Sequence, residues 1–370
     1  MRSGILHRCA ALLAITLTMI ASLAHEARAL DVQQPEVRRF IQHMVADNRF
    51  ERGALTHLLR RARKQDAIID AMNRPAEKAR LWYEYRQIFL TGKRIRDGVD
   101  FWVAHRDELQ RAAEDTGVEP QYIVAILGVE TLYGRQTGRY RVLDALGTLA
   151  FHYPERAGFF TAELEQFLLM AREDRIDPLT ATGSYAGAMG APQFMPSSYR
   201  RYGMDGDNDG KIDLWSDWPD VFSSIGNYFR AHGWEPGTPA MFEATLAPLM
   251  MPASDGRRFV LDQSIAALRE QGVQLQGIAG DSTAGAWGPA APDVIPPDSA
   301  PAGLIAVDRP DGLGLRVGLN NFNVITRYNR SALYGMVTVE LAAALRQHFD
   351  HERGPVSDDI AGATVLEWPP

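Results

Sequence analysis

Cysteine is almost absent from this sequence of 370 residues, because Cys9 is the only one. A chain with one thiol forms no internal disulfide and offers no cysteine cluster for a metal. The sequence also lacks an HExxH motif, a GxGxxG loop and a GK[ST] loop, which argues against a zinc peptidase and against a nucleotide-binding enzyme. It has no block of Lys and Arg, and its formal net charge of −7 argues against nucleic acid as a partner.

Long apolar runs are scarce too, and the clearest one lies at the N-terminus. A short basic stretch precedes an uncharged run of 16 residues from Cys9 to Ala24, and small residues follow at Ala27-Arg28-Ala29. This order predicts a secretory signal that is cleaved after Ala29, with cleavage after Ala24 as the alternative. The run is short for a membrane span of about 20 residues. We therefore expect a periplasmic protein without a stable membrane anchor.

The spacing of apolar residues changes along the chain. Helical spacing extends from Pro35 to about Trp234 and returns from Val324 to about His348, and short β-like runs lie between Pro236 and Leu319. This pattern predicts a mainly α (α+β) protein with a small β-rich insertion. The expected parts are a signal peptide (1–29), an N-terminal helical domain (30–117), a helical core (118–235), the insertion (236–319), a C-terminal helical part of the core (320–350) and a disordered tail (351–370).

Local signals set the expected ends of several elements. Gly117 is a favourable C-terminal cap, and Pro120 suits the first turn of the next helix. Before Gly117, four apolar residues share helical spacing: Val99, Trp102, Val103 and Leu109. Within the insertion, the expected strands and loop are Leu304–Val307, Leu315–Val317, a turn at Asp311-Gly312, and an Ala-, Pro- and Gly-rich surface loop from Gly277 to Gly303.

One carboxylate, Glu130, follows Ile123, Ile126 and Leu127 at the i+7 position of a helical stripe. Gly134 is expected to end this helix, which places Glu130 in the last turn. Burial and the negative end of the helix dipole would both raise the pKa of the carboxyl group, as a general acid near neutral pH requires. The pattern leaves open a structural glutamate paired with a nearby arginine, Arg135 or Arg139.

A glycine-rich segment runs from Gly183 to Gly190 and continues to Tyr199. Its three glycines within eight residues allow the backbone to approach a ligand closely. Ser184, Gln193 and Phe194 could form hydrogen bonds with a sugar and stack on it.

An aspartate-rich segment begins at Asp205 and matches the opening of an EF-hand loop. Asp205, Asp207 and Asp209 would supply side-chain oxygens to Ca²⁺, and Lys211 would supply its carbonyl oxygen. The twelfth position is Ser216 instead of glutamate, so the loop is not a standard EF-hand. We expect a structural calcium site, with a solvated turn as the alternative.

Several motifs together resemble one family. Gly128-Val129-Glu130-Thr131, the run GSYAGAMG followed by QFMPSSY, Asn227-Tyr228-Phe229 and Arg327-Tyr328-Asn329 occur in the order typical of the lytic murein transglycosylase B family. The resemblance covers about Val37 to Ala344. It implies a lysozyme-like core with an N-terminal helical domain and a small β domain. It also implies an enzyme that cleaves peptidoglycan between N-acetylmuramic acid and N-acetylglucosamine without water, leaving a 1,6-anhydro ring.

The resemblance also assigns roles to residues. Glu130 matches the catalytic glutamate, which acts first as acid and then as base. Arg156 matches one of two arginines that meet the peptide stem, whereas its neighbour Glu155 departs from the pattern. Asp220 matches the aspartate that closes the calcium loop, with Asp217 in reserve. The residues that match the glycan groove are Ser184, Gln193, Phe194, Tyr228, Tyr328, Asn329, Tyr334 and Tyr85.

Two other functions stay open on the sequence alone. A hydrolytic muramidase would need a second carboxylate, for which Asp144 and Asp174 are candidates. A glycan-binding protein without activity is the other alternative, and ordinary core packing could explain any single aromatic residue. No organic cofactor is indicated. The expected partners are peptidoglycan strands and other cell-wall enzymes.

Overall fold

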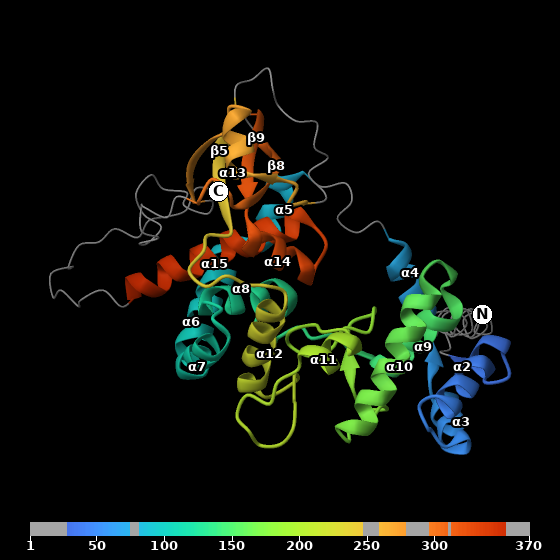
Figure 1. Ribbon diagram of the computed structural model, residues 1–370. Helices are drawn as coiled ribbons and strands as arrows, with labels where there is room; N and C mark the ends of the chain where they lie inside the picture. The colour runs from blue at the N-terminus through green and yellow to red at the C-terminus, as the bar shows by residue number, and fades with distance from the viewer. Residues whose placement is uncertain (1–27, 75–80, 247–258, 279–295, 310–311, 353–370) are drawn as a thin grey trace, which may run out of the picture. The chain divides into compact units, whose positions relative to one another are not determined.

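The computed structural model describes residues 28–74, 81–246, 259–278, 296–309 and 312–352 (Figure 1). The signal segment up to residue 27 and the tail from residue 353 lie outside the described residues. The described residues group into two compact units, one within Met1–Ala76 and Thr137–Arg201 and the other within Glu77–Gln136 and Tyr202–Pro370. Each unit combines two separate segments of the chain. The domain limits expected from composition follow the chain order and stay a prediction.

The first unit is mainly helical. Its longest helix is α10 (Ala157–Glu173), which packs on α9 (Val142–His152). Helix α9 is buried from Val142 to Phe151 because this stretch is almost entirely apolar. Its helices are α2 (Pro35–Ala46), α3 (Arg52–Arg60), α4 (Asp66–Asn73), α9 (Val142–His152), α10 (Ala157–Glu173) and α11 (Pro196–Tyr202). Two short antiparallel pairs complete it: β1 (Arg28–Ala29) with β2 (Arg63–Lys64), and β3 (Tyr140–Arg141) with β4 (Thr182–Gly183).

The second unit is built around helix α8 (Pro120–Thr131). The helices α6, α7, α12 and α15 all pack on α8, so its residues from Ile123 to Gly128 are buried around the whole circumference. The predicted apolar stripe is therefore only part of its buried surface. The other helices of this unit are α5 (Trp82–Phe89), α6 (Gly92–Ala104), α7 (Arg106–Thr116), α12 (Trp218–Ala231), α14 (Asn320–Tyr328) and α15 (Ala332–Glu352).

A five-stranded antiparallel sheet belongs to the second unit, with the order β6-β8-β9-β5-β7. Ile305 pairs with Arg316 between the two longest strands. Helix α13 (Ile265–Glu270) closes a small apolar core over the sheet, to which Phe242, Leu268 and Val317 contribute. The strands are β5 (Met241–Thr245), β6 (Gln263–Ser264), β7 (Gln274–Ile278), β8 (Pro301–Arg309) and β9 (Gly312–Gly318).

The mainly α architecture with a small sheet confirms the predicted class. Gly117 caps α7 with a φ of 75°, and Pro120 is the first residue of α8, as predicted. The predicted strands at Leu304–Val307 and Leu315–Val317 lie within β8 and β9. Among the described residues, no helix combines the length and the apolar character that crossing a membrane would require.

Three local predictions were wrong. The helical spacing that continues from Val99 to Gly117 covers two helices, because α6 ends at Ala104 and α7 begins at Arg106, and Val103 is 52% exposed although it shares that spacing. The predicted C-terminal helix is two helices, α14 and α15, separated at residues 329–331. The predicted loop from Gly277 to Gly303 is too long at both ends, which lie in β7 and β8, and residues 279–295 lie outside the described residues.

Candidate active site

Glu130 is the penultimate residue of α8. The helix ends at Thr131, earlier than the predicted end at Gly134, because Leu132, Tyr133 and Gly134 all adopt positive φ angles of 50°, 60° and 78°. Glu130 therefore lies in the last turn as predicted, but it is half-buried and not fully enclosed like the apolar residues before it. The end of the helix keeps this carboxylate accessible.

Tyr334 in the first turn of α15 donates a hydrogen bond from its hydroxyl group to Glu130 Oε1 at 2.7 Å. Its side chain is only 2% exposed. Burial raises the pKa of the Tyr334 hydroxyl well above its ordinary value, and the negative charge of Glu130 raises it further. The phenol therefore stays protonated and remains a donor to the carboxylate at any pH near neutrality.

Three further tyrosines, Tyr328, Tyr228 and Tyr85, belong to the same unit. Burial raises the pKa of the Tyr328 hydroxyl well above its usual range, and the negative charge of Glu130 raises it further. The rings of Tyr228 and Tyr328 meet at 4.9 Å in a T-shaped contact, and the Tyr228 hydroxyl donates to the Arg327 carbonyl at 2.7 Å. Tyr85 is buried, and its influence on the pKa of Tyr334 places it close by. Asn329 is exposed directly after α14.

The two arginines considered as structural partners of Glu130 make other contacts. Arg135 forms an ion pair with Asp97 at 2.8 Å. The guanidinium group of Arg139 lies 5.9 Å from the centre of the Tyr140 ring. Tyr334 is a hydrogen-bond partner of Glu130, whereas Arg135 and Arg139 have the contacts just given.

Ser184 and Gln193 hold together the loop that follows β4 in the first unit. Ser184 Oγ accepts hydrogen bonds from the amides of Ala186 at 3.3 Å and Ala188 at 3.1 Å. Gln193, whose φ is 54°, uses Nε2 to donate to the carbonyls of Thr137 at 3.0 Å and Gly190 at 2.9 Å. The groups that they can offer a substrate are therefore the hydroxyl proton of Ser184 and the Oε1 acceptor of Gln193.

The glycines of this loop have internal explanations. A Cβ atom on Gly183 would lie 2.2 Å from the Ala188 carbonyl oxygen, and one on Gly187 would lie 2.4 Å from Leu146. Close approach of a ligand is not needed to explain them. Phe194 exchanges two backbone hydrogen bonds with Met189, and its side chain is 2% exposed. A ring buried to this extent offers little surface for stacking on a sugar.

Other predicted residues of the first unit have clear surroundings. Arg156 is exposed, with its guanidinium group 4.6 Å from the centre of the Phe159 ring. Glu155 accepts a hydrogen bond from the Tyr153 hydroxyl at 2.9 Å. The buried Asp144 binds Arg141 through both of its oxygens, at 2.8 and 2.9 Å. Asp174 follows the last residue of α10 and is exposed as a whole. The protein atoms around its carboxyl group still remove some water from it, which raises its pKa.

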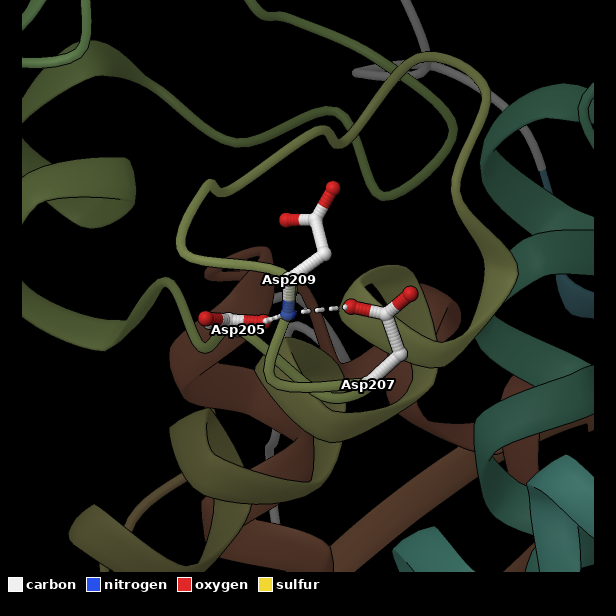
Figure 2. Close-up of side chains that lie close together, drawn as sticks. All are labelled: Asp205, Asp207 and Asp209. Carbon is white, nitrogen blue, oxygen red and sulfur yellow. Dashed lines mark hydrogen bonds between the residues drawn. The ribbon is translucent and has the colours of Figure 1, made fainter.

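Asp205, Asp207 and Asp209 gather at one loop of the second unit, with one oxygen from each within 4.8 Å of the others. The Asp209 amide donates to Asp205 Oδ1 at 3.1 Å and to Asp207 Oδ1 at 3.0 Å, so the two carboxylates flank it (Figure 2). Gly210 has a φ of 88°, which suits the glycine of the turn. Three hard oxygen donors in one turn fit the preference of Ca²⁺.

The later aspartates have a different place. The buried Asp220 accepts hydrogen bonds from the Gly206 amide at 2.6 Å and from the Asp213 amide at 2.7 Å. Asp217 caps α12 through the Asp220 amide at 3.3 Å. Neither belongs to the group of three carboxylates. Lys211 is exposed, and its amide donates to Asp209 Oδ1 at 2.9 Å. Asp220 thus ties the loop to α12.

Two buried carboxylates, Glu163 and Glu340, and the contact between Tyr334 and Glu130 were not predicted from the sequence. Glu163 on α10 accepts hydrogen bonds from the Ser197 amide at 2.9 Å and the Ser197 hydroxyl at 2.6 Å. Its signal was present, because Phe160, Leu164 and Phe167 surround it at helical spacing. The bond between Tyr334 and Glu130 had no such signal, because 204 positions separate these residues.

The known proteins that this chain is similar to are transglycosylases. A family model described as the transglycosylase SLT domain matches residues 32–343. Membrane-bound lytic murein transglycosylase B of Escherichia coli (strain K12) is 38% identical over 320 residues, which cover 84% of this chain and 82% of that protein. The soluble lytic transglycosylase SltB1 from Pseudomonas aeruginosa is 42% identical with a TM-score of 0.77, covering 86% of this chain and 100% of that one. Escherichia coli Slt35 in complex with calcium is 37% identical with a TM-score of 0.74, covering 88% and 98%.

Proposed function

The chain belongs to the SLT-domain transglycosylase family, and from this membership we propose that it cleaves the glycan strands of peptidoglycan with Glu130 as its single acid and base. The enzyme is a lytic transglycosylase with a mainly α, lysozyme-like fold. The assignment of Glu130 rests on one observation. At the end of α8, Glu130 accepts a hydrogen bond from the buried Tyr334 of α15. A carboxylate held in one orientation at an accessible helix end is suited to proton transfer.

The reaction begins when Glu130 donates a proton to the oxygen that links N-acetylmuramic acid to N-acetylglucosamine. The bond from this oxygen to C1 breaks, and the substrate's own N-acetyl group stabilises the positive charge that develops at C1. Glu130, now a carboxylate, accepts the proton of the C6 hydroxyl group, and the C6 oxygen bonds to C1. One proton leaves Glu130 and one returns, so the 1,6-anhydro ring forms without water.

Tyr334 would direct the proton of Glu130. Because its hydroxyl donates to Oε1, the acid form of Glu130 would carry its proton on Oε2. Tyr334 would therefore determine which oxygen of Glu130 carries the proton. Asp144, one of the two candidates for the second carboxylate of a hydrolytic muramidase, is unsuited to that role because Arg141 binds both of its oxygens.

The residues that match the groove would share the binding of the glycan. We assign the hydroxyl proton of Ser184 and Gln193 Oε1 to orienting the N-acetyl and C6 groups of the muramyl ring. Tyr328 and Asn329 would contact the sugar, and Tyr228 and Tyr85 would support those contacts within the second unit. Phe194 would support the loop of the first unit that carries Gln193. Arg156 would meet a carboxylate of the peptide stem, and the neighbouring Glu155 would repel one.

Calcium would bind at the loop formed by Asp205, Asp207 and Asp209, with Lys211 offering its carbonyl oxygen and Asp220 closing the loop. The bound ion would offset the repulsion among the three carboxylates. Because Asp220 connects this loop to α12, which carries Tyr228, the ion would stabilise one side of the groove. We infer a structural role in the periplasm, after cleavage of the N-terminal signal.

Product analysis tests the proposed reaction. Peptidoglycan sacculi digested with the purified protein should release muropeptides that end in 1,6-anhydro-N-acetylmuramic acid, identified by mass spectrometry. Each such product is lighter than its hydrolysed counterpart by one water. Reducing ends in place of anhydro ends would show a hydrolase, and intact sacculi that retain bound protein would show a binding protein without activity.

A further inference from the structure

A buried cluster of ion pairs in the second unit takes no part in the mechanism above. Glu340 on α15 is 5% exposed, and its Oε1 accepts a hydrogen bond from Arg316 Nη2 at 2.6 Å. Its Oε2 accepts a hydrogen bond from Arg86 Nε. Arg316 on β9 is buried as well, and its Nε donates to Glu243 Oε1 at 2.8 Å. One carboxylate thus connects α15 to α5 and to the sheet.

Stability alone explains such a cluster poorly. Removing charges from water is costly, and apolar residues of similar size often stabilise a core as well as a buried ion pair does. A buried ion pair does, however, impose direction, because each hydrogen bond requires a defined geometry. Glu340 is held from two sides, by Arg86 and Arg316, which restrains both rotation and sliding of α15.

The helix held in this way also carries Tyr334. Glu340 follows Tyr334 by six residues, or about 9 Å along the helix axis. Tyr334 in turn donates to Glu130 Oε1. Arg86 follows Tyr85, a buried residue close enough to Tyr334 to raise the pKa of its hydroxyl group. The helix that Glu340 anchors is therefore the same helix that carries the Tyr334 hydroxyl group, which orients the catalytic carboxylate.

We propose that Glu340 is a positioning residue for the reaction, which acts through α15 to hold the Tyr334 hydroxyl against Glu130. The small sheet then contributes to catalysis without touching the substrate, because Arg316 on β9 supplies one of the two contacts. This proposal rests on the proposed function of Glu130.

Glu340→Gln tests it, because the amide has a similar shape but weakens the contacts with both arginines. A displacement of about 1 Å near a reacting group can cost up to a hundredfold in rate, so we expect kcat to fall about tenfold with KM within twofold of the wild-type value. In a Tyr334→Phe background, Glu340→Gln should reduce kcat no further, because the contact through which it acts is already gone. Both variants are assayed as the full chain on sacculi.

Asp350→Asn is the matched control. It removes a carboxylate from the same helix, where Asp350 pairs with Arg346 near the surface, and it should leave kcat unchanged. If Glu340→Gln does not fold, Arg86→Gln removes one of the two contacts at a residue whose side chain is 42% exposed. This variant should also lower kcat and also have no further effect in the Tyr334→Phe background.

Two results would overturn the proposal. The first is a folded Glu340→Gln enzyme with wild-type kcat, even if its melting temperature is lower. The second is a loss of kcat that multiplies with the loss caused by Tyr334→Phe, which would indicate general loosening of the fold. Full activity in Glu130→Gln would instead contradict the proposed function itself, so the two failures are distinguishable.

Discussion

Glu130 on α8 and Glu163 on α10 occupy similar positions in their sequences, among apolar residues at helical spacing. Glu163 lies in the middle of its helix, and both of its oxygens accept hydrogen bonds from Ser197 at the start of α11. Glu130 lies at the end of its helix, half-buried, and accepts a hydrogen bond from a tyrosine hydroxyl. A carboxylate in an apolar stripe is therefore not by itself a sign of catalysis. What differs between the two is their place in the helix and their burial, because Glu163 is buried in mid-helix and Glu130 is half-buried at a helix end.

The largest effect should come from replacing the two carboxylates in turn. Glu130→Gln should lose at least a hundredfold in turnover, because an amide cannot donate and then accept the proton, and its melting temperature should stay close to wild type. Glu163→Gln should lower stability by about 1–3 kcal/mol, because a buried amide replaces a charged acceptor. Turnover on sacculi and thermal melts of both variants provide the measurement. Equal losses of turnover in the two would remove the distinction.

The donors to the two carboxylates should differ in the same way. Tyr334→Phe should lower kcat about tenfold, because the hydroxyl orients Glu130 in the transition state. Ser197→Ala should instead lower the melting temperature by a few degrees, because it removes one hydrogen bond to a buried carboxylate. Steady-state kinetics on muropeptide oligomers would separate them. An unchanged kcat in Tyr334→Phe would leave Tyr334 with a packing role only.

Ser184 and Gln193 test whether the first unit takes part in the chemistry at all. Ser184→Ala and Gln193→Ala should each lower kcat more than they raise KM, because the two side chains would orient groups whose contacts strengthen in the transition state. Leu179→Ala, in a loop of the same unit, serves as a control. A rise in KM alone would assign both residues to ground-state binding.

The calcium loop should affect stability more than chemistry. Adding Ca²⁺ at a hundredfold excess over Kd should raise the free energy of unfolding by about 2.7 kcal/mol. The melting temperature should rise accordingly. Asp205→Ala combined with Asp209→Ala should abolish this rise while the protein stays folded without metal. Differential scanning calorimetry with calcium, with magnesium and with chelator measures it. A wild-type melting temperature that is the same with calcium and with chelator would contradict the metal site.

Some of these features could be predicted from the sequence because their signals are local. Gly117 ends α7 through a left-handed conformation that glycine tolerates, and Pro120 begins α8 because it lacks the N–H group that would go unused there. The aspartate cluster follows from spacing within one turn. The break after Ala104 could not be predicted, since Val103 continues the apolar spacing although it is exposed.

The candidate site depended on a different kind of information. Glu130 was found through its motif, because its apolar stripe also occurs around Glu163. The hydrogen bond from Tyr334 and the contact between Arg86 and Glu340 join residues 204 and 254 positions apart. No local pattern encodes such contacts, because they result from the packing of α15 against α8 and α5.

The smallest effect should come from Glu165, a half-buried carboxylate two residues after Glu163. Glu165 Oε2 lies 3.0 Å from His43 Nε2, and this hydrogen bond is the main reason that the pKa of His43 is raised. A raised pKa in the folded state means that the pair stabilises the protein fully below the unfolded pKa of about 6.5, and that this stabilisation is lost as pH rises through the folded value.

Glu165→Gln should therefore lower the melting temperature by about 1 °C at pH 5.5 and by less at pH 9, since exposed pairs contribute little. Thermal melts of wild type and variant at the two pH values measure the difference. His43→Gln should abolish the pH dependence of this difference, because no titrating partner remains. Glu165 Oε1 also accepts a hydrogen bond from Asn48 Nδ2 at 2.9 Å. A loss of melting temperature that is equal at both pH values would show that Glu165 acts through Asn48 and not through the charge of His43.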